Sequence, residues 1–300
     1  MKTVTARSPF FRLQPILPYA ALAGAMITFC IGTSFAKQMF PLVGAEATAA
    51  YRVGFAALML MAFWRPWRFG LSRADLIVTA RYGAALGCMN LCFYMALRTI
   101  PLGLAIAIEF LGPLAVSLIH SRRPAHFAMV GLAVAGLLLL IPLHPTDQAL
   151  DPTGVAFALA AGVCWGLYIV FGKRTSHLHG GQAVALGMAM AAVIVVPVGA
   201  YQAGTALFAP GLLLMGLVTA LLSSAIPYSL EMVALKRIPS NSFGVLMSVD
   251  PAIGAISGVF LLGEHLTAMQ WLAIALVVAA SIGSVATTSA TDDEGRITPS

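Results

Sequence analysis

The chain has 300 residues, of which 60% are hydrophobic and 9% charged, with a formal net charge of +6 and a mean hydropathy of +0.91. This composition excludes a water-soluble globular domain, which could not stay in solution with so few charges. The basic residues occupy short separate segments and form no continuous stripe, so the positive charge does not indicate a nucleic-acid partner.

Ten apolar stretches follow one another along the chain. Each is long enough, at about 1.5 Å per residue, to cross or nearly cross a hydrocarbon core of roughly 30 Å. They cover residues 15–35, 46–64, 76–97, 102–119, 127–141, 153–171, 182–198, 212–235, 241–262 and 268–285. The first stretch follows basic residues as a secretory signal does, but signal cores are shorter, about 7–15 residues. The sequence therefore predicts an all-α, polytopic membrane protein of ten transmembrane helices.

Lysine and arginine gather in every second connection between these stretches. The even-numbered connections carry Arg65, Arg68 and Arg73; Arg122 and Arg123; Lys173 and Arg174; and Lys236 and Arg237, while Lys2, Arg7 and Arg12 precede the first stretch. The odd-numbered connections hold only Lys37 and Arg98. Because cytoplasmic loops carry the excess of lysine and arginine, this pattern predicts that both termini are cytoplasmic.

An internal repeat relates the two halves of the chain. A shift of 138 residues brings residues 96–101 onto residues 234–239 and Pro113 onto Pro251. A unit of five spans has an odd number of crossings, so its second copy enters the membrane from the opposite side. We therefore expect two inverted five-helix repeats, residues 1–144 and 145–286, and a disordered cytoplasmic tail, residues 287–300. Inverted repeats are typical of secondary transporters, although a duplication can also simply enlarge a bundle.

The predicted spans contain charged residues whose burial demands an explanation, namely Arg52, Glu109, Glu231 and Asp250. Each costs about 2.5–3.5 kcal/mol near the bilayer centre, so such residues usually face a cavity or a partner. Arg52 and Glu109 lie roughly 9 and 12 Å from the outer membrane surface and are able to pair. This pair would be either a structural salt bridge or a direct contact with substrate.

Three prolines interrupt predicted spans close to these acids. Pro251 follows Asp250 directly, Pro113 lies four residues after Glu109, and Pro227 lies four residues before Glu231. Proline removes a backbone hydrogen bond and kinks a helix, so these positions are candidates for gating. The alternative is a kink that only shapes the bundle, with the acid bonded to a neighbouring hydroxyl.

Aromatic and amide side chains within the spans are further candidates for a substrate path, although helix packing explains several of them equally well. These residues are Asn90, Tyr94, Trp165, Tyr168 and Tyr228. No histidine or cysteine has the spacing of a metal site, and no cofactor is indicated. The chain lacks a phosphate-binding loop for ATP and a nucleophile and base for catalysis, which argues against an intramembrane lipid-modifying enzyme.

Several stretches of the chain match the pattern of a known family. They are residues 40–44, 100–103, 109–116, 121–124, 227–232, 243–252 and 263–264, together with Leu266, Thr267 and Gln270. Through these stretches the chain resembles the ten-helix EamA-like branch of the drug/metabolite transporter superfamily, and most closely its bacterial inner-membrane threonine/homoserine exporters. The family pattern more often has glutamate where this chain has Asp250. The shorter side chain keeps the charge but loses reach.

The resemblance implies a multi-pass protein of the bacterial inner membrane that exports threonine and homoserine in exchange for protons. Its partners would be the amino acid, the proton and the lipid bilayer. Glu109 or Asp250 would bind the substrate ammonium, and Arg52 or helix-end amides its carboxylate. A broader exporter of metabolites or drugs is the alternative, since related folds carry many substrates. Proton stoichiometry and oligomeric state do not follow from the residues.

Overall fold

The computed structural model describes residues 17–120, 124–139, 150–175, 177–235, 237–238, 243 and 246–297, and these ranges contain helices and no strand. The basic residues Lys2, Arg7, Arg12, Arg122, Arg123 and Lys236 lie outside the described residues. Within the described ranges, six helices or helical runs are long and apolar enough to cross a membrane. They comprise α2 (Leu17–Gln38), α3 (Phe40–Trp64), α4 (Arg73–Ala96), α8 (Pro152–Arg174), α9 (Gly180–Ala203) and the run from α10 (Pro210–Ala220) into α11 (Ile226–Leu235).

The remaining apolar segments are shorter. They comprise α5 (Leu102–Glu109) with α6 (Leu111–His120), α7 (Pro124–Leu138), α13 (Asp250–Leu262) and α14 (Ala268–Ile297). Together with the longer helices they follow the order of the ten predicted stretches, so the chain is a polytopic membrane protein. The described part of the tail, residues 287–297, continues α14 as helix, while residues 298–300 lie outside the described residues.

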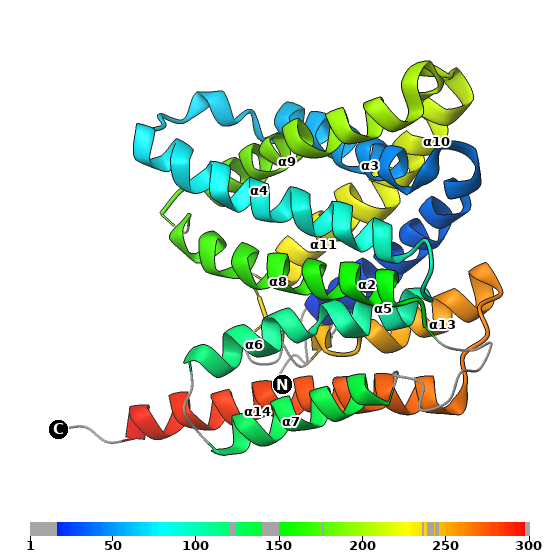
Figure 1. Cartoon of the computed structure of the whole chain (residues 1–300). Helices are drawn as coiled ribbons and strands as arrows, with labels where there is room; N and C mark the ends of the chain where they lie inside the picture. Colours follow the sequence, from blue (N-terminus) through cyan, green and yellow to red (C-terminus); the bar gives the residue numbers. More distant parts are fainter. Residues whose placement is uncertain are drawn as a thin grey trace, which may run out of the picture.

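Each helix of the first half packs on a helix of the second half (Figure 1). The contacting pairs are α2 with α11, α3 with α9, α4 with α8, α5 with α13 and α7 with α14. In Figure 1, α7 and α14 lie side by side along the lower edge, and α3 and α9 lie together at the opposite edge. The two halves are therefore interleaved and share one core, in which Tyr94, Leu97 and Ile106 are almost completely buried.

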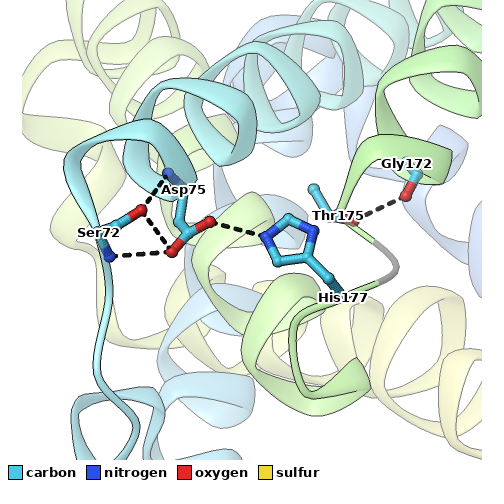
Figure 2. A network of polar contacts seen from close by, with 5 residues as sticks. All are labelled: Ser72, Asp75, Gly172, Thr175 and His177. Carbon is cyan, nitrogen blue, oxygen red and sulfur yellow. Dashed lines mark hydrogen bonds and ion pairs between the residues drawn. The ribbon is translucent and has the colours of Figure 1, made fainter.

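Polar contacts join the connections that the charge pattern places on the same side. At the predicted inner end, Asp75 in the first turn of α4 accepts a hydrogen bond of 2.7 Å from His177, which precedes α9 (Figure 2). Asp75 also forms a capping box with Ser72, which fixes the start of α4. At the predicted outer end, Arg98 and Glu46 form an ion pair of 3.3 Å.

Several boundaries differ from the sequence prediction. The helix α3 begins at Phe40, six residues before the expected Glu46, because Pro41 suits a first helical turn and Gly44 adopts a φ of 81° at a kink. The fourth predicted span breaks at Phe110, between α5 and α6. The ninth is described as α13 only from Asp250, preceded by a turn at Ser248 and Val249.

Small residues allow two helices to approach closely beside the break in the fourth span. A Cβ on Gly112 of α6 would collide with the backbone carbonyl of Gly162 in α8, and a Cβ on Gly162 would lie 2.8 Å from the carbonyl oxygen of Glu109. Glu109 is therefore held against α8 by direct backbone packing.

Candidate substrate cavity

A cavity of about 140 Å³ lies between helices of both halves. A cavity of this size suits a small molecule. Its lining side chains come from α2, α3, α4, α5, α8, α11 and α13 and from the segment before α13. They are Ala25, Met26, Phe29, Arg52, Leu86, Met89, Asn90, Phe93, Ile106, Glu109, Trp165, Tyr168, Pro227, Tyr228, Glu231, Met247 and Asp250.

The structure brings nearly all of the predicted site residues to this one cavity. Arg52, Asn90, Glu109, Trp165, Tyr168, Tyr228, Glu231 and Asp250 line it, and so does Pro227. Tyr94 does not line the cavity but lies behind it, where its ring contacts the guanidinium of Arg52. Pro113 and Pro251 are not among the lining residues and act on the backbone of their helices.

Arg52 is buried and held firmly, with 3% of its surface exposed. Its Nε donates to Ser224 Oγ at 3.0 Å, and its Nη2 donates to the carbonyl of Ser223 at 3.1 Å. The centre of the guanidinium lies 5.2 Å from the ring of Phe29 and 5.4 Å from that of Tyr94, within the range of a cation–π interaction. A guanidinium has five N–H donors, so several remain for a ligand in the cavity.

The carbonyl of Ser223 that accepts from Arg52 belongs to an irregular stretch of the eighth predicted span. Residues Leu221–Ala225 form a π-helical turn between α10 and α11. Pro227 has no N–H, so it cannot bond the carbonyl of Ser223 one turn earlier, and that carbonyl accepts from Arg52 instead. The predicted irregularity at Pro227 is therefore present, and it positions the charge of another helix. Such π-helical turns occur frequently at functional sites.

Glu109 lies at the end of α5, with 7% of its surface exposed. The break after it is explained by Pro113, which lacks the N–H that would bond the carbonyl of Glu109. Among the described side chains, Arg52 bonds Ser223 and Ser224, and the structure shows no ion pair between Arg52 and Glu109. Both side chains line the same cavity.

Asp250 is the first residue of α13 and has 7% of its surface exposed. Its Oδ1 is buried, and no described group donates a hydrogen bond to it. Glu109 and Glu231 line the same cavity. A buried carboxylate without a partner is costly, and a proton or a cationic ligand would remove this cost. Pro251 lies in the first turn of α13, where the missing N–H of proline costs no helical hydrogen bond.

The neutral polar side chains of the cavity are also fixed. Asn90 donates from Nδ2 to the carbonyl of Leu86 at 2.8 Å, which leaves its amide oxygen as an acceptor. Trp165 packs edge to face on Phe110, with ring centroids 5.1 Å apart. The hydroxyl of Tyr168 accepts from the hydroxyl of Tyr82 at 3.1 Å. These contacts keep the donors and acceptors of the cavity in place before a ligand arrives.

Sequence reasoning missed two groups of residues. Phe29, Met26 and Phe93 line the cavity but look like ordinary apolar residues of a spanning helix. Tyr82 lies near the inner end of a predicted span, where aromatic residues at the membrane interface are expected. Its spacing from Tyr168 along the chain carries no signal, because the two residues meet only when α4 packs on α8.

Within the described ranges, no three histidine, cysteine, aspartate or glutamate side chains gather to hold a metal ion. The cysteines Cys30, Cys88, Cys92 and Cys164 are all free thiols. What the cavity offers is one guanidinium, three carboxyl groups and several neutral hydrogen-bonding groups. This set suits a small ligand that carries both a positive and a negative group.

Comparison with known proteins gives consistent results. The family model described as "EamA-like transporter family" matches residues 152–286. The chain is 49% identical over 276 residues to the threonine/homoserine exporter RhtA of Salmonella typhimurium (strain SL1344), covering 92% of this chain and 94% of that protein. It is 48% identical over 277 residues to the protein of the same name from Escherichia coli (strain K12), with the same coverage.

More distant similarities agree. The uncharacterized inner membrane transporter YedA of Escherichia coli (strain K12) is 26% identical over 195 residues, which is 62% of each chain. One crystal structure, 20% identical in sequence, matches 91% of this chain and 97% of its own with a TM-score of 0.57. That structure supports the fold alone.

Proposed function

The chain belongs to the EamA-like transporter family, and from this we propose that it exports small neutral amino acids, with threonine and homoserine as its substrates. The main support is its identity of 48 to 49% to proteins named as threonine/homoserine exporters, over 92% of its length. The inner-membrane name of YedA supports a location in the bacterial inner membrane. The chain is a transporter and not an enzyme.

The observation that carries the proposal is the composition of the cavity. Threonine and homoserine are zwitterions at neutral pH and need partners for both charges when they leave water. Arg52 supplies a preorganised guanidinium for the carboxylate, and guanidinium–carboxylate pairs are among the stronger hydrogen-bonded pairs. Glu109 and Asp250 supply carboxyl groups for the ammonium. These residues come from α3, α5 and α13, so a substrate would contact both halves at once.

The packing of the helices supports two inverted repeats, residues 1–144 and 145–286. Exchanging the halves turns the pair α2 with α11 into the pair α8 with α4, and it leaves the pairs α3 with α9, α5 with α13 and α7 with α14 unchanged. Equivalent interruptions support the same view, since the break at Phe110 and the turn at Ser248 are related by the shift of 138 residues. This architecture suits alternating access to a central site, with both termini in the cytoplasm.

Proton coupling follows from the same carboxyl groups in this proposal. Glu109 or Asp250 binds a proton and the substrate alternately, so release of the amino acid on one side is linked to uptake of a proton there. The unpartnered Oδ1 of Asp250 supports this role, because it is ready to accept one or the other.

The test is transport by the purified full-length protein in lipid vesicles with an imposed proton gradient. Labelled threonine and homoserine should accumulate, and unlabelled threonine and homoserine should compete better than aromatic amino acids or a cationic dye. Equal competition by all of them would indicate a broad exporter of metabolites or drugs, which the aromatic lining of Phe29, Trp165 and Tyr168 also suits. Vesicles that move none of these compounds would contradict transport altogether.

A further inference from the structure

Tyr82 lies outside the cavity but is bonded to a side chain that lines it. Its hydroxyl donates to the hydroxyl of Tyr168 at 3.1 Å, and the two rings stack with centroids 4.8 Å apart and an interplanar angle of 28°. Tyr82 has 5% of its surface exposed. The contact joins α4 of the first half to α8 of the second half.

The position of the Tyr82 ring is fixed by its surroundings. A Cβ on Gly187 of α9 would collide with the ring, and a Cβ on Gly172 of α8 would lie 3.4 Å from it. The ring therefore fills a space that α9 provides only because residue 187 is glycine, and it lies close to Gly172 of α8. A tyrosine enclosed in this way has little freedom to turn its hydroxyl away from Tyr168.

The hydrogen bond to Tyr82 leaves Tyr168 with capacity for a second partner. A phenol hydroxyl has one proton to donate and can accept through its oxygen. The bond to Tyr82 uses one of these capacities, so the other remains for a further hydrogen bond. Tyr168 lines the cavity, so this side of the cavity presents a neutral hydroxyl whose orientation is held from behind.

Threonine and homoserine share one polar group beyond their two charges, a side-chain hydroxyl. In the proposed function, the charged groups of the substrate are taken by Arg52 and the carboxyl groups. We propose that Tyr82 is a positioning residue for specificity: it holds the Tyr168 hydroxyl so that this group forms a hydrogen bond with the side-chain hydroxyl of the substrate. A site that hydrogen-bonds a substrate hydroxyl rejects the analogue that lacks it. This inference rests on the proposed function and adds the basis for choosing hydroxy amino acids over aliphatic ones.

Valine tests this point, because it has nearly the shape of threonine and no hydroxyl. In vesicles containing the full-length protein, uptake of labelled threonine is measured against unlabelled threonine and unlabelled valine. Selectivity is the inhibition constant of valine divided by that of threonine. This ratio does not depend on how much of the protein is active. In Tyr82→Phe this ratio should fall by about 3- to 10-fold, the equivalent of one hydrogen bond, mainly because threonine binds less tightly.

Tyr51→Phe is the matched control. Tyr51 is also buried and its hydroxyl donates to the carbonyl of Leu207 at 2.7 Å, but it does not line the cavity. Its loss should lower thermal stability and leave the selectivity ratio unchanged. Tyr168→Phe should reduce the ratio as Tyr82→Phe does, and the double variant should add little, because both changes remove the same interaction.

The outcomes separate this inference from the proposed function. A folded Tyr82→Phe protein with the wild-type ratio, or with threonine and valine weakened equally, would overturn the positioning role alone. Wild-type vesicles that transport no threonine would contradict the proposed function, and the inference with it.

Discussion

Lys37 and Glu264 lie 227 residues apart in the chain and form an ion pair of 2.7 Å. The same lysine donates to the carbonyl of Ile100 at 3.1 Å, and Oε2 of the glutamate accepts from the backbone N–H of Leu102 at 2.9 Å. One contact therefore ties together the end of α2, the start of α5 and the connection after α13. Glu264 therefore accepts from the first N–H of α5, while Thr267 and Gln270 bond each other at the start of α14.

Removing one partner of this pair should destabilise the protein. In Glu264→Gln, the ammonium of Lys37 keeps a carbonyl but loses its counter-charge in a site where the two side chains are only 21% and 11% exposed. Breaking a partly buried pair of this kind should lower the free energy of unfolding by about 1–3 kcal/mol, which is less than the roughly 3–5 kcal/mol lost when a fully buried pair is broken. The melting temperature in detergent should fall by several degrees, and Lys37→Met combined with Glu264→Gln should recover part of the loss.

Glu46→Gln is the matched comparison for that experiment. It breaks the pair between Glu46 and Arg98, in which the arginine side chain is 50% exposed. An exposed pair contributes about 0–1 kcal/mol, so the melting temperature should hardly change. Equal losses of melting temperature in Glu264→Gln and Glu46→Gln would show that the Lys37–Glu264 pair stabilises the protein no more than the exposed pair does.

The close approach of α6 to α8 predicts a sharp contrast between two glycines. Gly112→Ala places a methyl group against the carbonyl of Gly162, so the helices must separate, at a cost of about 1–3 kcal/mol. Gly131→Ala in α7 meets nothing within 4 Å and should be neutral or slightly stabilising. Melting temperatures of the two purified variants check this, and similar values for both would contradict the packing described.

Arg52 should be replaceable by lysine for folding but not for transport. Arg52→Lys keeps the positive charge but loses the planar fork that contacts Ser223 and Ser224. The KM for threonine should rise roughly tenfold or more, which corresponds to one charged hydrogen bond of about 1.5–3 kcal/mol. Arg81→Lys, at an exposed position of α4, is the control and should transport normally. An unchanged KM in Arg52→Lys would place the substrate carboxylate elsewhere.

Asp151 gives a prediction about pH at the start of α8. A hydrogen bond from the Thr99 side chain, with backbone bonds from Thr153 and Gly154, lowers the pKa of its carboxyl below the ordinary value. A carboxyl whose folded pKa is lowered stabilises the fold fully above the unfolded pKa of about 3.9, and this stabilisation is lost as pH falls through the folded pKa. Asp151→Ala should thus reduce the melting temperature at neutral pH. The difference in melting temperature between Asp151→Ala and wild type should shrink below about pH 4. A difference that stayed constant with pH would show that the charged carboxylate of Asp151 is not the source of the stabilisation.

Much of the fold could be predicted because the bilayer imposes strong rules on sequence. Apolar length located the helices, and the cost of burying charge singled out Arg52, Glu109, Glu231 and Asp250, which line one cavity. Proline marked the positions where helices break, as at Pro113 and Pro227, because its missing N–H is a local property that needs no tertiary structure.

The remainder depends on tertiary contacts. The partner of Arg52 is a backbone carbonyl on a π-helical turn, and no charge pattern announces it. The role of Tyr82 depends on the packing of α4, α8 and α9, which brings a tyrosine near the inner end of one span against the cavity wall. Such residues carry no sequence signal, because any aromatic side chain near a helix end is equally compatible with the membrane interface.

The central claim is that a carboxyl group of the cavity couples amino-acid export to proton movement. It is tested most directly by following labelled threonine in vesicles that contain wild type, Glu109→Gln or Asp250→Asn, with and without an imposed proton gradient. The account predicts that at least one variant loses gradient-driven accumulation and its pH dependence while it still exchanges labelled for unlabelled threonine. If both variants accumulate threonine as wild type does, with the same pH dependence, neither carboxyl is the coupling site and the proposed mechanism is wrong.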